Sequence, residues 1–258
     1  MNPRAGDGGP GSDELAEAAR AYGVEPRVLE EGDDPAALAR ASAAEVIGMA
    51  GGDGSLAPVA EAVLERGAAF VCVPFGTRNH FARDLGLDRG DPLAALAAFG
   101  GNERRIDVAR AGGRLFLNNV SFGVYASLVH RREHHRRRRD ALARARALTR
   151  TLRHPHRERL IVDGAPIVAR VVLVANNAYE LDVFDLGARE SLTEGRLYLY
   201  SADGLVPTRW QERAGESFTL DGAGVLRAAV DGEPAELGSP VECRIEPRAL
   251  RVLVPPGG

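Results

Sequence analysis

The sequence contains no lysine, and all 33 of its basic residues are arginine. This absence excludes a lysine nucleophile and a phosphate-binding lysine. Cysteine is also scarce, because only Cys72 and Cys243 occur. Both lie in apolar, strand-like runs far apart in the sequence, where a small buried thiol is commoner than a disulfide or a metal ligand. We therefore expect both cysteines in the core.

Long apolar runs are absent as well. No stretch of about 18 apolar residues occurs, and the N-terminal segment has no basic region followed by an apolar one. We therefore expect neither a membrane span nor export, and a cytoplasmic protein that is at most peripheral at the inner face of the membrane. The 258 residues, 45% hydrophobic and 27% charged, are typical of a globular protein with one large or two smaller domains.

Positive charge is concentrated in one stretch. Arg131–Arg159 holds twelve arginines and three acidic residues, so it carries about +9 while the rest of the chain carries about −12. Within it, residues 134–153 are predicted to form a polar helix with a narrow apolar stripe. A basic amphipathic helix is typical of contact with anionic lipid, and a solvated helix packed on β structure explains the pattern equally well. Nucleic-acid binding is not expected, because no aromatic residues interleave the arginines.

Residues 45–110 alternate between apolar runs and helical patterns. Strands are predicted at 45–49 and 69–73, and helices at 56–66 and 93–99. Strands that alternate with helices of this length indicate a parallel sheet with helices on its faces. The sequence therefore predicts an α/β domain with a doubly wound, parallel-type sheet over residues 1–105.

Closely spaced strand patterns follow residue 105. They occur at 115–117, 160–162, 168–175, 196–200, 217–220, 225–230 and 241–245. This spacing predicts a second, β-rich antiparallel domain over residues 106–246. A last apolar run at 250–254 is expected to return, within residues 247–258, to complete the first domain.

A glycine-rich loop, Gly51-Gly52-Asp53-Gly54-Ser55, follows the first predicted strand and precedes a helix. Glycines let the backbone approach an anion, and the helix that follows offers free N–H groups and its positive dipole end. A strand-to-helix turn without a ligand is the alternative. An aspartate enclosed by three glycines after a buried strand favours the nucleotide site.

Two further polar loops accompany it. Residues 74–79 follow the next strand, so both loops are expected at the carboxyl edge of one sheet, where ligands of open α/β sheets bind. Thr77 is suited to hydrogen bonding with phosphate, while Asn79 either does the same or caps the helix that begins near His80. The opening residues Asn2 to Gly6 form a third glycine-containing loop. Late in the chain, Asp231-Gly232-Glu233 reads by itself as a hairpin turn.

Together these segments resemble the catalytic domain shared by diacylglycerol kinases, sphingosine kinases and their bacterial lipid-kinase relatives. The family pattern is Asn-Pro-x-x-Gly, then Gly-Gly-Asp-Gly-Thr, then Pro-x-Gly-Thr-x-Asn-Asp-Phe-Ala-Arg, and a late Asp-Gly-Glu. The matching segments begin at Asn2, Gly51, Pro74 and Asp231, and residues 118–123 are similar to the segment that enters the second domain. Four motifs in the same order are far more specific than any one of them.

The resemblance implies an ATP-dependent lipid kinase whose active site lies in the cleft between the two domains. The implied nucleotide-binding residues are Asn2, Pro3, Arg4, Ala5, Gly6, Gly51, Gly52, Asp53, Gly54, Ser55, Gly76, Thr77 and Asn79. Glu233 is implied as the catalytic base that takes the proton from the acceptor hydroxyl, with Asp231 in support and Asp53 as a carboxylate at the phosphates. Mg²⁺ is implied as the ion that offsets developing charge.

Three departures from the family pattern bear on these expectations. His80 stands where the family usually has aspartate, which removes a carboxylate and introduces a pH-sensitive group. The second, structural Mg²⁺ site of bacterial relatives aligns with Ser191, Glu194 and Arg196, where glutamate replaces aspartate. Met1 directly precedes Asn2 where the family has a full buried strand, so we expect a gap or an altered edge in the sheet.

Other functions fit parts of the pattern. NAD kinases and phosphofructokinases, which phosphorylate soluble acceptors, also carry a Gly-Gly-Asp-Gly loop, but they do not explain the other three motifs. A lipid-binding protein of the same fold with weakened turnover is suggested by His80 and the missing strand. Retention of Asp53, Thr77, Asp231 and Glu233 favours the lipid kinase.

Overall fold

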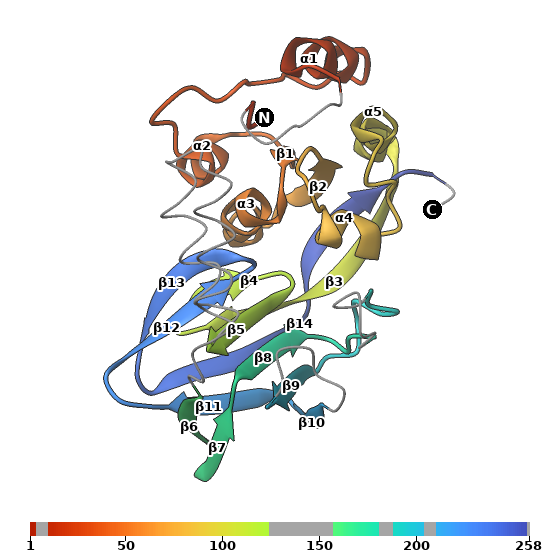
Figure 1. Ribbon diagram of the computed structural model, residues 1–258. Helices are drawn as coiled ribbons and strands as arrows, with labels where there is room; N and C mark the ends of the chain where they lie inside the picture. Colours follow the sequence, from red (N-terminus) through yellow and green to blue (C-terminus); the bar gives the residue numbers. More distant parts are fainter. Residues whose placement is uncertain (4–9, 124–156, 181–187, 204–209, 257–258) are drawn as a thin grey trace, which may run out of the picture. The chain divides into compact units, whose positions relative to one another are not determined.

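The computed structural model describes residues 1–3, 10–123, 157–180, 188–203 and 210–256. They fall into two compact units (Figure 1). The first comprises Met1–Val108, Ala188–Thr193 and Pro247–Gly258, and the second comprises Ala109–Gly187 and Glu194–Glu246. Ala188–Thr193 lies in the first unit, although the sequence pattern placed it in the second domain. The helix predicted at 134–153 lies outside the described residues.

The first unit contains a parallel sheet, as predicted. Strand β1 (Val46–Gly51) pairs in parallel with β2 (Ala69–Pro74), from Val46 opposite Ala69 to Gly51 opposite Pro74. The end of the long strand β14 (Val241–Val254) pairs in parallel with the other side of β2. All six residues of β2 are buried, which is typical of a parallel strand covered on both faces.

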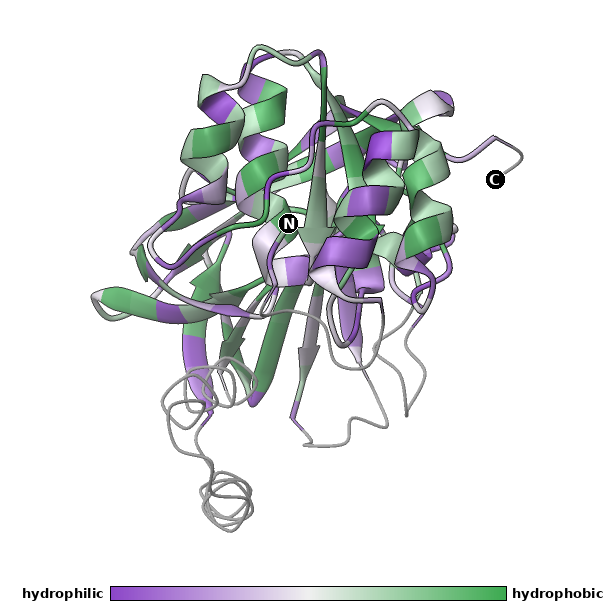
Figure 2. Cartoon of the chain, turned by 90° about the horizontal axis from the view of Figure 1, so that it is seen from above, coloured by the Kyte–Doolittle hydropathy of each residue, from purple (hydrophilic) through white to green (hydrophobic). Residues whose placement is uncertain are grey.

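Helices surround this sheet. They are α1 (Ser12–Ala21), α2 (Pro35–Ala41), α3 (Asp53–Glu65), α4 (His80–Asp84) and α5 (Pro92–Ala95), followed by a 3₁₀ helix, η1 (Leu96–Gly100). The predicted helix 56–66 is therefore confirmed but begins earlier, and the predicted helix 93–99 divides between α5 and η1. Helix α1 combines hydrophobic and hydrophilic residues (Figure 2), and it buries Leu15, Ala16 and Ala19, as expected for a helix with one buried face. No described helix has the length and apolar character needed to cross a membrane.

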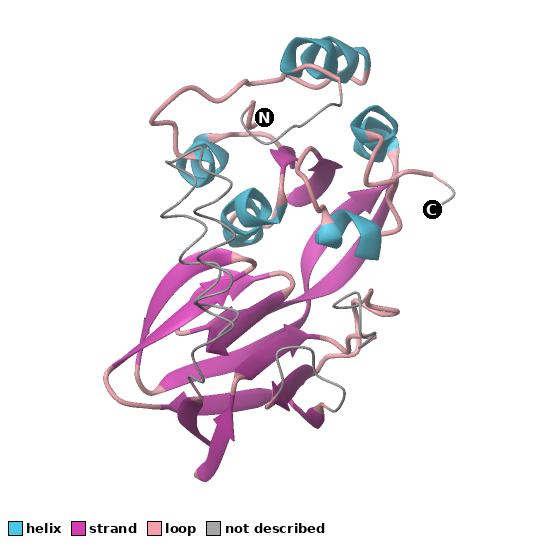
Figure 3. Cartoon of the chain, viewed as in Figure 1, coloured by secondary structure: helices cyan, strands magenta, loops and turns pink. Residues whose placement is uncertain are grey.

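The described part of the second unit is built from antiparallel strands (Figure 3). One sheet has the order β10-β9-β8-β5-β12-β13. Its strands are β5 (Asn119–Gly123), β8 (Val171–Asn176), β9 (Leu197–Ala202), β10 (Gln211–Gly215), β12 (Val225–Val230) and β13 (Glu233–Gly238). The other strands are β3 (Asn102–Ala111), which begins in the first unit, β4 (Arg114–Phe116), β6 (Glu158–Val162), β7 (Ala165–Ala169) and β11 (Ser217–Asp221), with the first half of β14.

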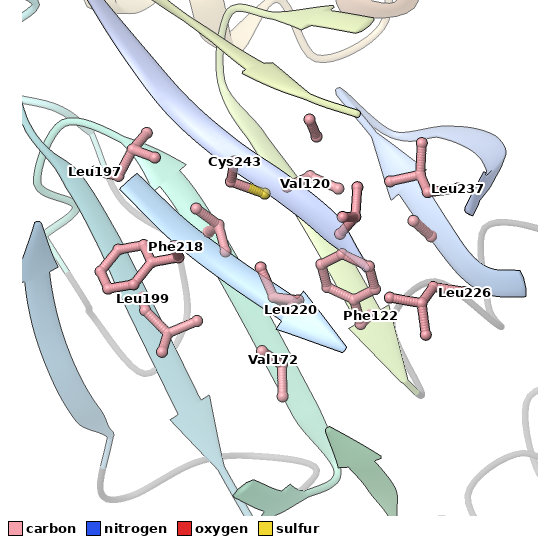
Figure 4. Packing of buried hydrophobic residues seen from close by; sticks show 14 of the residues in the cluster. Val120, Phe122, Val172, Leu197, Leu199, Phe218, Leu220, Leu226, Leu237 and Cys243 are labelled. Carbon is pink, nitrogen blue, oxygen red and sulfur yellow. The ribbon is translucent and has the colours of Figure 1, made fainter. Parts of the chain in front are cut away.

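The core of the second unit is formed by alternate residues of these strands. Phe122, Val172 and Leu199 face Phe218 and Leu220 (Figure 4). Cys243 is part of this core and Cys72 is buried in β2, so both cysteines are core residues as expected. The predicted strand 168–175 is in fact two strands, β7 and β8, because residues up to Ala169 pair with β6 in one sheet and residues from Val171 pair with β5 and β9 in the other.

Candidate functional site

The two glycine loops of the first unit meet backbone to backbone. Gly52 is the N-cap residue of α3 and, as a glycine, makes no side-chain capping bond. Gly76 follows β2, and a Cβ atom placed on it would collide with the Gly52 backbone. Parallel pairing of β1 and β2 brings both loops to the same sheet edge. The loops therefore form a glycine-lined cradle at the N-terminus of α3, where close backbone approach and the first N–H groups of the helix suit an anion such as phosphate.

Asp53 joins the starts of two helices. It is the first residue of α3, and its carboxylate accepts hydrogen bonds from the backbone N–H groups of His80 (3.1 Å) and Phe81 (3.0 Å). Those two groups open α4, so Asp53 caps that helix from a distant part of the chain. The structure thus gives Asp53 a positioning role, and its participation in catalysis stays a prediction.

Asn79 shapes the second loop from within. It has φ 49°, in the left-handed region, and its side chain is buried. The Oδ1 atom accepts from Gly76 N (2.9 Å), and Nδ2 donates to Gly76 O (2.8 Å) and Arg89 O (3.1 Å). The expectation that Asn79 caps α4 is wrong, because its side chain makes no capping bond and Asp53 takes that place. Thr77, in contrast, is exposed.

The N-terminal loop reaches the first glycine loop through Asn2. Its backbone N–H donates to Ala50 O (2.9 Å), and its Nδ2 lies 3.4 Å from Ser55 Oγ. Gly54 and Ser55 lie in the first turn of α3. Of the other residues predicted in this loop, Pro3 is exposed, while Arg4, Ala5 and Gly6 lie outside the described residues.

His80 is partly buried beside these loops. Burial lowers the pKa of its imidazole. The positive charges of Arg83 and Arg78 lower this pKa further, while the negative charges of Asp53 and Asp84 raise it. Within the described residues, its Nδ1 atom is buried and has no hydrogen-bond partner. An imidazole in this setting favours the neutral form.

We expect His80 to make the protein less stable in mild acid. Below about pH 6.5 an ordinary histidine gains a proton, whereas His80 in the folded chain resists protonation. The unfolded state then binds more protons, so the free energy of unfolding falls as the pH drops through this window. Urea unfolding should show that the free energy of unfolding falls less between pH 7.5 and pH 5.5 in His80→Gln than in the wild-type chain. An equal loss in both would mean that burial of His80 does not govern this pH dependence.

In the second unit, Asp231-Gly232 forms the turn between β12 and β13. Both residues have positive φ, 48° and 82°, as in the type I′ turns that favour Asp-Gly. The buried Asp231 carboxylate also accepts three backbone hydrogen bonds, from Leu117 (2.8 Å), Asn118 (2.8 Å) and Asn119 (3.0 Å). The turn reading is therefore right, and the turn also anchors β5. Glu233, the first residue of β13, is partly buried directly after it.

The residues predicted for a structural metal site are engaged in other contacts. Ser191 Oγ accepts from Thr193 N (3.1 Å), and Glu194 accepts from the Tyr198 hydroxyl (2.8 Å), which raises the pKa of that tyrosine. Arg196 is exposed. Across the described ranges, no group of three or more His, Cys, Asp or Glu side chains is placed to hold a metal ion. The metal site stays a prediction.

Two features of these regions were not predicted from the sequence. An aromatic cluster of Tyr179, Tyr198, Tyr200 and Trp210 lies in the second unit, with Tyr200 central to three ring contacts. Tyr179 also accepts a hydrogen bond from Nδ2 of Asn119 (2.9 Å), the residue whose backbone N–H is bonded to Asp231. The other feature is an ion pair between Asp84 and Arg189. No local sequence signal indicates either, because their members come from separate segments.

Residues 1–111 match the family model described as the diacylglycerol kinase catalytic domain. A probable lipid kinase, YegS-like, of Pseudomonas aeruginosa is 44% identical over 100 residues, which are 38% of this chain and 30% of that protein. The diacylglycerol kinase of Bacillus subtilis is 36% identical over 89 residues, which are 33% of this chain and 29% of that protein. The matched stretch thus spans less than a third of each relative.

Solved structures resemble the chain over nearly its whole length. A diacylglycerol kinase from Bacillus anthracis has a TM-score of 0.70 at 16% identity, covering 98% of this chain and 94% of its own. A putative diacylglycerol kinase from the same organism has a TM-score of 0.73 at 19% identity, with the same coverage. These similarities confirm the predicted fold class, and the sequence matches confirm the predicted resemblance over the N-terminal part.

Proposed function

We propose that this chain transfers the γ-phosphate of ATP to a hydroxyl group of a lipid alcohol. The observation that carries the proposal is the cradle at Gly52 and Gly76, which lies in the segment that matches the diacylglycerol kinase catalytic domain. The named relatives over this segment are a probable lipid kinase and a diacylglycerol kinase. The assignment of a lipid alcohol as the acceptor rests on the names of those relatives.

The nucleotide side of the proposal is supported by positioned backbone groups. Catalysis of phosphoryl transfer depends mainly on placing the phosphates and stabilising their charge. Here the N-terminus of α3 offers backbone N–H groups for that purpose, and the two glycine loops let the phosphates approach the backbone closely. Because the chain has no lysine, arginine is the cationic side chain available to the phosphates, beside neutral donors such as backbone N–H groups and the Thr77 hydroxyl.

The acceptor side is assigned to Glu233. We propose that its carboxylate takes the proton from the acceptor hydroxyl as the oxygen attacks the γ-phosphorus and ADP leaves. Asp231 does not have to touch the substrate for this role. Its three backbone hydrogen bonds fix the turn from which Glu233 projects. Asp231 is thus a positioning residue for Glu233.

Mg²⁺ is proposed to enter with the nucleotide. Such ions are usually held by substrate phosphates and one or two carboxylates, and they offset the charge of the transferred group. Both Asp53 oxygens already accept backbone hydrogen bonds, and the described residues offer no preformed group of three ligands. We therefore assign no residue of this chain as a metal ligand.

We also propose that the basic stretch Arg131–Arg159 favours anionic lipid surfaces. Most of this stretch lies outside the described residues, and the support is its charge of about +9. Arg157 and Arg159 are described, and both are exposed. A kinase of membrane lipids has to reach an acceptor at the bilayer surface, which such a stretch would assist.

The proposal is tested with ATP labelled at the γ-phosphate. Dioleoylglycerol in neutral or anionic vesicles is offered as acceptor, and NAD and fructose 6-phosphate are offered in parallel. We expect label in the lipid, with more in anionic vesicles at low salt. Label in NAD or the sugar phosphate alone would favour the soluble-acceptor alternative. Absence of transfer with retained lipid binding would favour a lipid-binding protein.

We expect Gly52→Ala to weaken ATP binding at least about tenfold without unfolding the chain. Gly52 has φ −84°, which alanine adopts readily, and its Cβ atom would lie 3.5 Å from Gly76 Cα, an ordinary contact. The methyl group would instead keep the phosphates away from the backbone. Isothermal titration with ATP measures the effect, and Gly238→Ala, where a Cβ meets nothing within 4 Å, is the control. Unchanged affinity in folded Gly52→Ala would place the phosphates elsewhere.

A further inference from the structure

A buried ion pair ties the segment Ala188–Thr193 to α4. Arg189 Nε donates to Asp84 Oδ2 at 2.7 Å, and the two side chains are 0% and 2% exposed. Arg83 Nε donates to the other Asp84 oxygen at 2.9 Å. The same segment is held a second time, because Asp107 N donates to Leu192 O at 2.8 Å. The segment is thus fixed to the first unit at two points.

The position of Asp84 explains why it requires cations. Asp84 is the last residue of α4, where a carboxylate meets the negative end of the helix dipole. Two guanidinium groups compensate this unfavourable placement. Removing one partner of a buried pair is costly, because the other charge stays desolvated. The Asp84–Arg189 ion pair should therefore keep the two side chains in contact in the folded protein.

Helix α4 is consequently fixed at both ends. Asp53 holds its first N–H groups at His80 and Phe81, and Arg189 holds its last residue. A five-residue helix spans only about 7.5 Å, so a shift at one end displaces the other. The loop that contains Gly76 and Asn79 leads directly into this helix.

We infer that Arg189 is a positioning residue for the nucleotide cradle. It anchors α4 through Asp84, so that α4 presents His80 and Phe81 to Asp53 and thereby sets the placement of the two glycine loops. This inference rests on the proposed function for the identity of the ligand. The link runs from the Arg189–Asp84 ion pair through α4 to the hydrogen bonds of Asp53.

Amide hydrogen exchange tests the link without any nucleotide. In Arg189→Met the His80 and Phe81 amides should exchange at least about tenfold faster, while the β2 amides of Val71 and Cys72 keep their protection. Arg189→Lys retains the positive charge. On a logarithmic scale of exchange rate, its His80 and Phe81 amides should therefore show at most half of the acceleration seen in Arg189→Met. Arg40→Met is the matched control, since it breaks the exposed Arg40–Glu65 pair of the same unit. This control should leave the His80 and Phe81 amides unchanged.

ATP titration of the same variants then tests the consequence. Arg189→Met should weaken ATP binding about tenfold, and Arg189→Lys should lie within about threefold of the wild-type chain. Equal acceleration of the β2 amides, or unchanged exchange at His80 and Phe81, would overturn the inference. Faster exchange at the His80 and Phe81 amides of Arg189→Met, together with unchanged ATP affinity, would also overturn the inference. If the wild-type chain itself binds no ATP, the proposed function fails, whereas the selective exchange would still establish Arg189 as the anchor of α4.

Discussion

Replacing Glu233 by glutamine should lower turnover by at least about 100-fold while leaving ATP affinity nearly unchanged. Glutamine preserves the size of the side chain and much of its hydrogen bonding, but it does not accept the proton of the acceptor hydroxyl. Because ATP is proposed to bind at the glycine loops, its affinity does not depend on this carboxylate. Steady-state lipid phosphorylation and ATP titration measure the two quantities.

A control for this variant lies on the same strand. Glu236 is exposed and three residues further along β13, so Glu236→Gln should retain near wild-type turnover. Thermal unfolding of both variants shows whether folding is intact. Full turnover in Glu233→Gln, together with abolished turnover in Asp53→Asn, would mean that the base has been assigned to the wrong residue.

Asp231→Asn should lower the free energy of unfolding by about 2–3 kcal/mol. Asparagine tolerates the left-handed conformation at this position, so the turn itself should survive. Its amide group, however, replaces one carboxylate oxygen by a donor. At least one of the buried N–H groups of Leu117, Asn118 and Asn119 then faces another donor in place of an acceptor. Urea unfolding at pH 7.5 measures the loss.

The chain contains a matched control for this change. Asp163-Gly164 forms a second Asp-Gly turn with positive φ at both residues, between β6 and β7. The Asp163 side chain is 36% exposed and accepts from Thr219 N at 2.8 Å. Solvent replaces lost bonds there, so Asp163→Asn should cost less than about 1 kcal/mol. Equal losses at the two turns would show that the Asp231 anchor adds nothing beyond turn formation.

The first unit was predictable because its signals are local. The apolar runs at 46–51 and 69–74, each followed by glycine and a helix, specify parallel strands joined by crossovers. The order of the motifs then indicated the resemblance to the diacylglycerol kinase catalytic domain, which the family model matches over residues 1–111. In contrast, the strands at 102–111 and 119–123 were missed, because their arginine, aspartate and asparagine residues interrupt the apolar pattern.

The roles of individual site residues were less accessible. Asn79 reads as a helix cap, yet the cap is Asp53, which lies more than twenty residues earlier in the chain. Asp84 and Arg189 are 105 residues apart, and nothing in either neighbourhood marks the pair. Asp231 illustrates the opposite case, because a strong turn signal concealed a carboxylate that also binds three distant N–H groups. Such contacts depend on tertiary packing, which sequence periodicity does not encode.

We propose that the glycine cradle and Glu233 together transfer the γ-phosphate of ATP to a lipid hydroxyl. This transfer is measured by incubating dioleoylglycerol vesicles with ATP labelled at either the α- or the γ-phosphate and extracting the lipid. We predict label in the lipid from γ-labelled ATP alone, at least about 100-fold less with Glu233→Gln, and near wild-type amounts with Glu236→Gln. Unlabelled lipid in the presence of folded wild-type protein and bound ATP would contradict the account, as would equal transfer by the two glutamate variants.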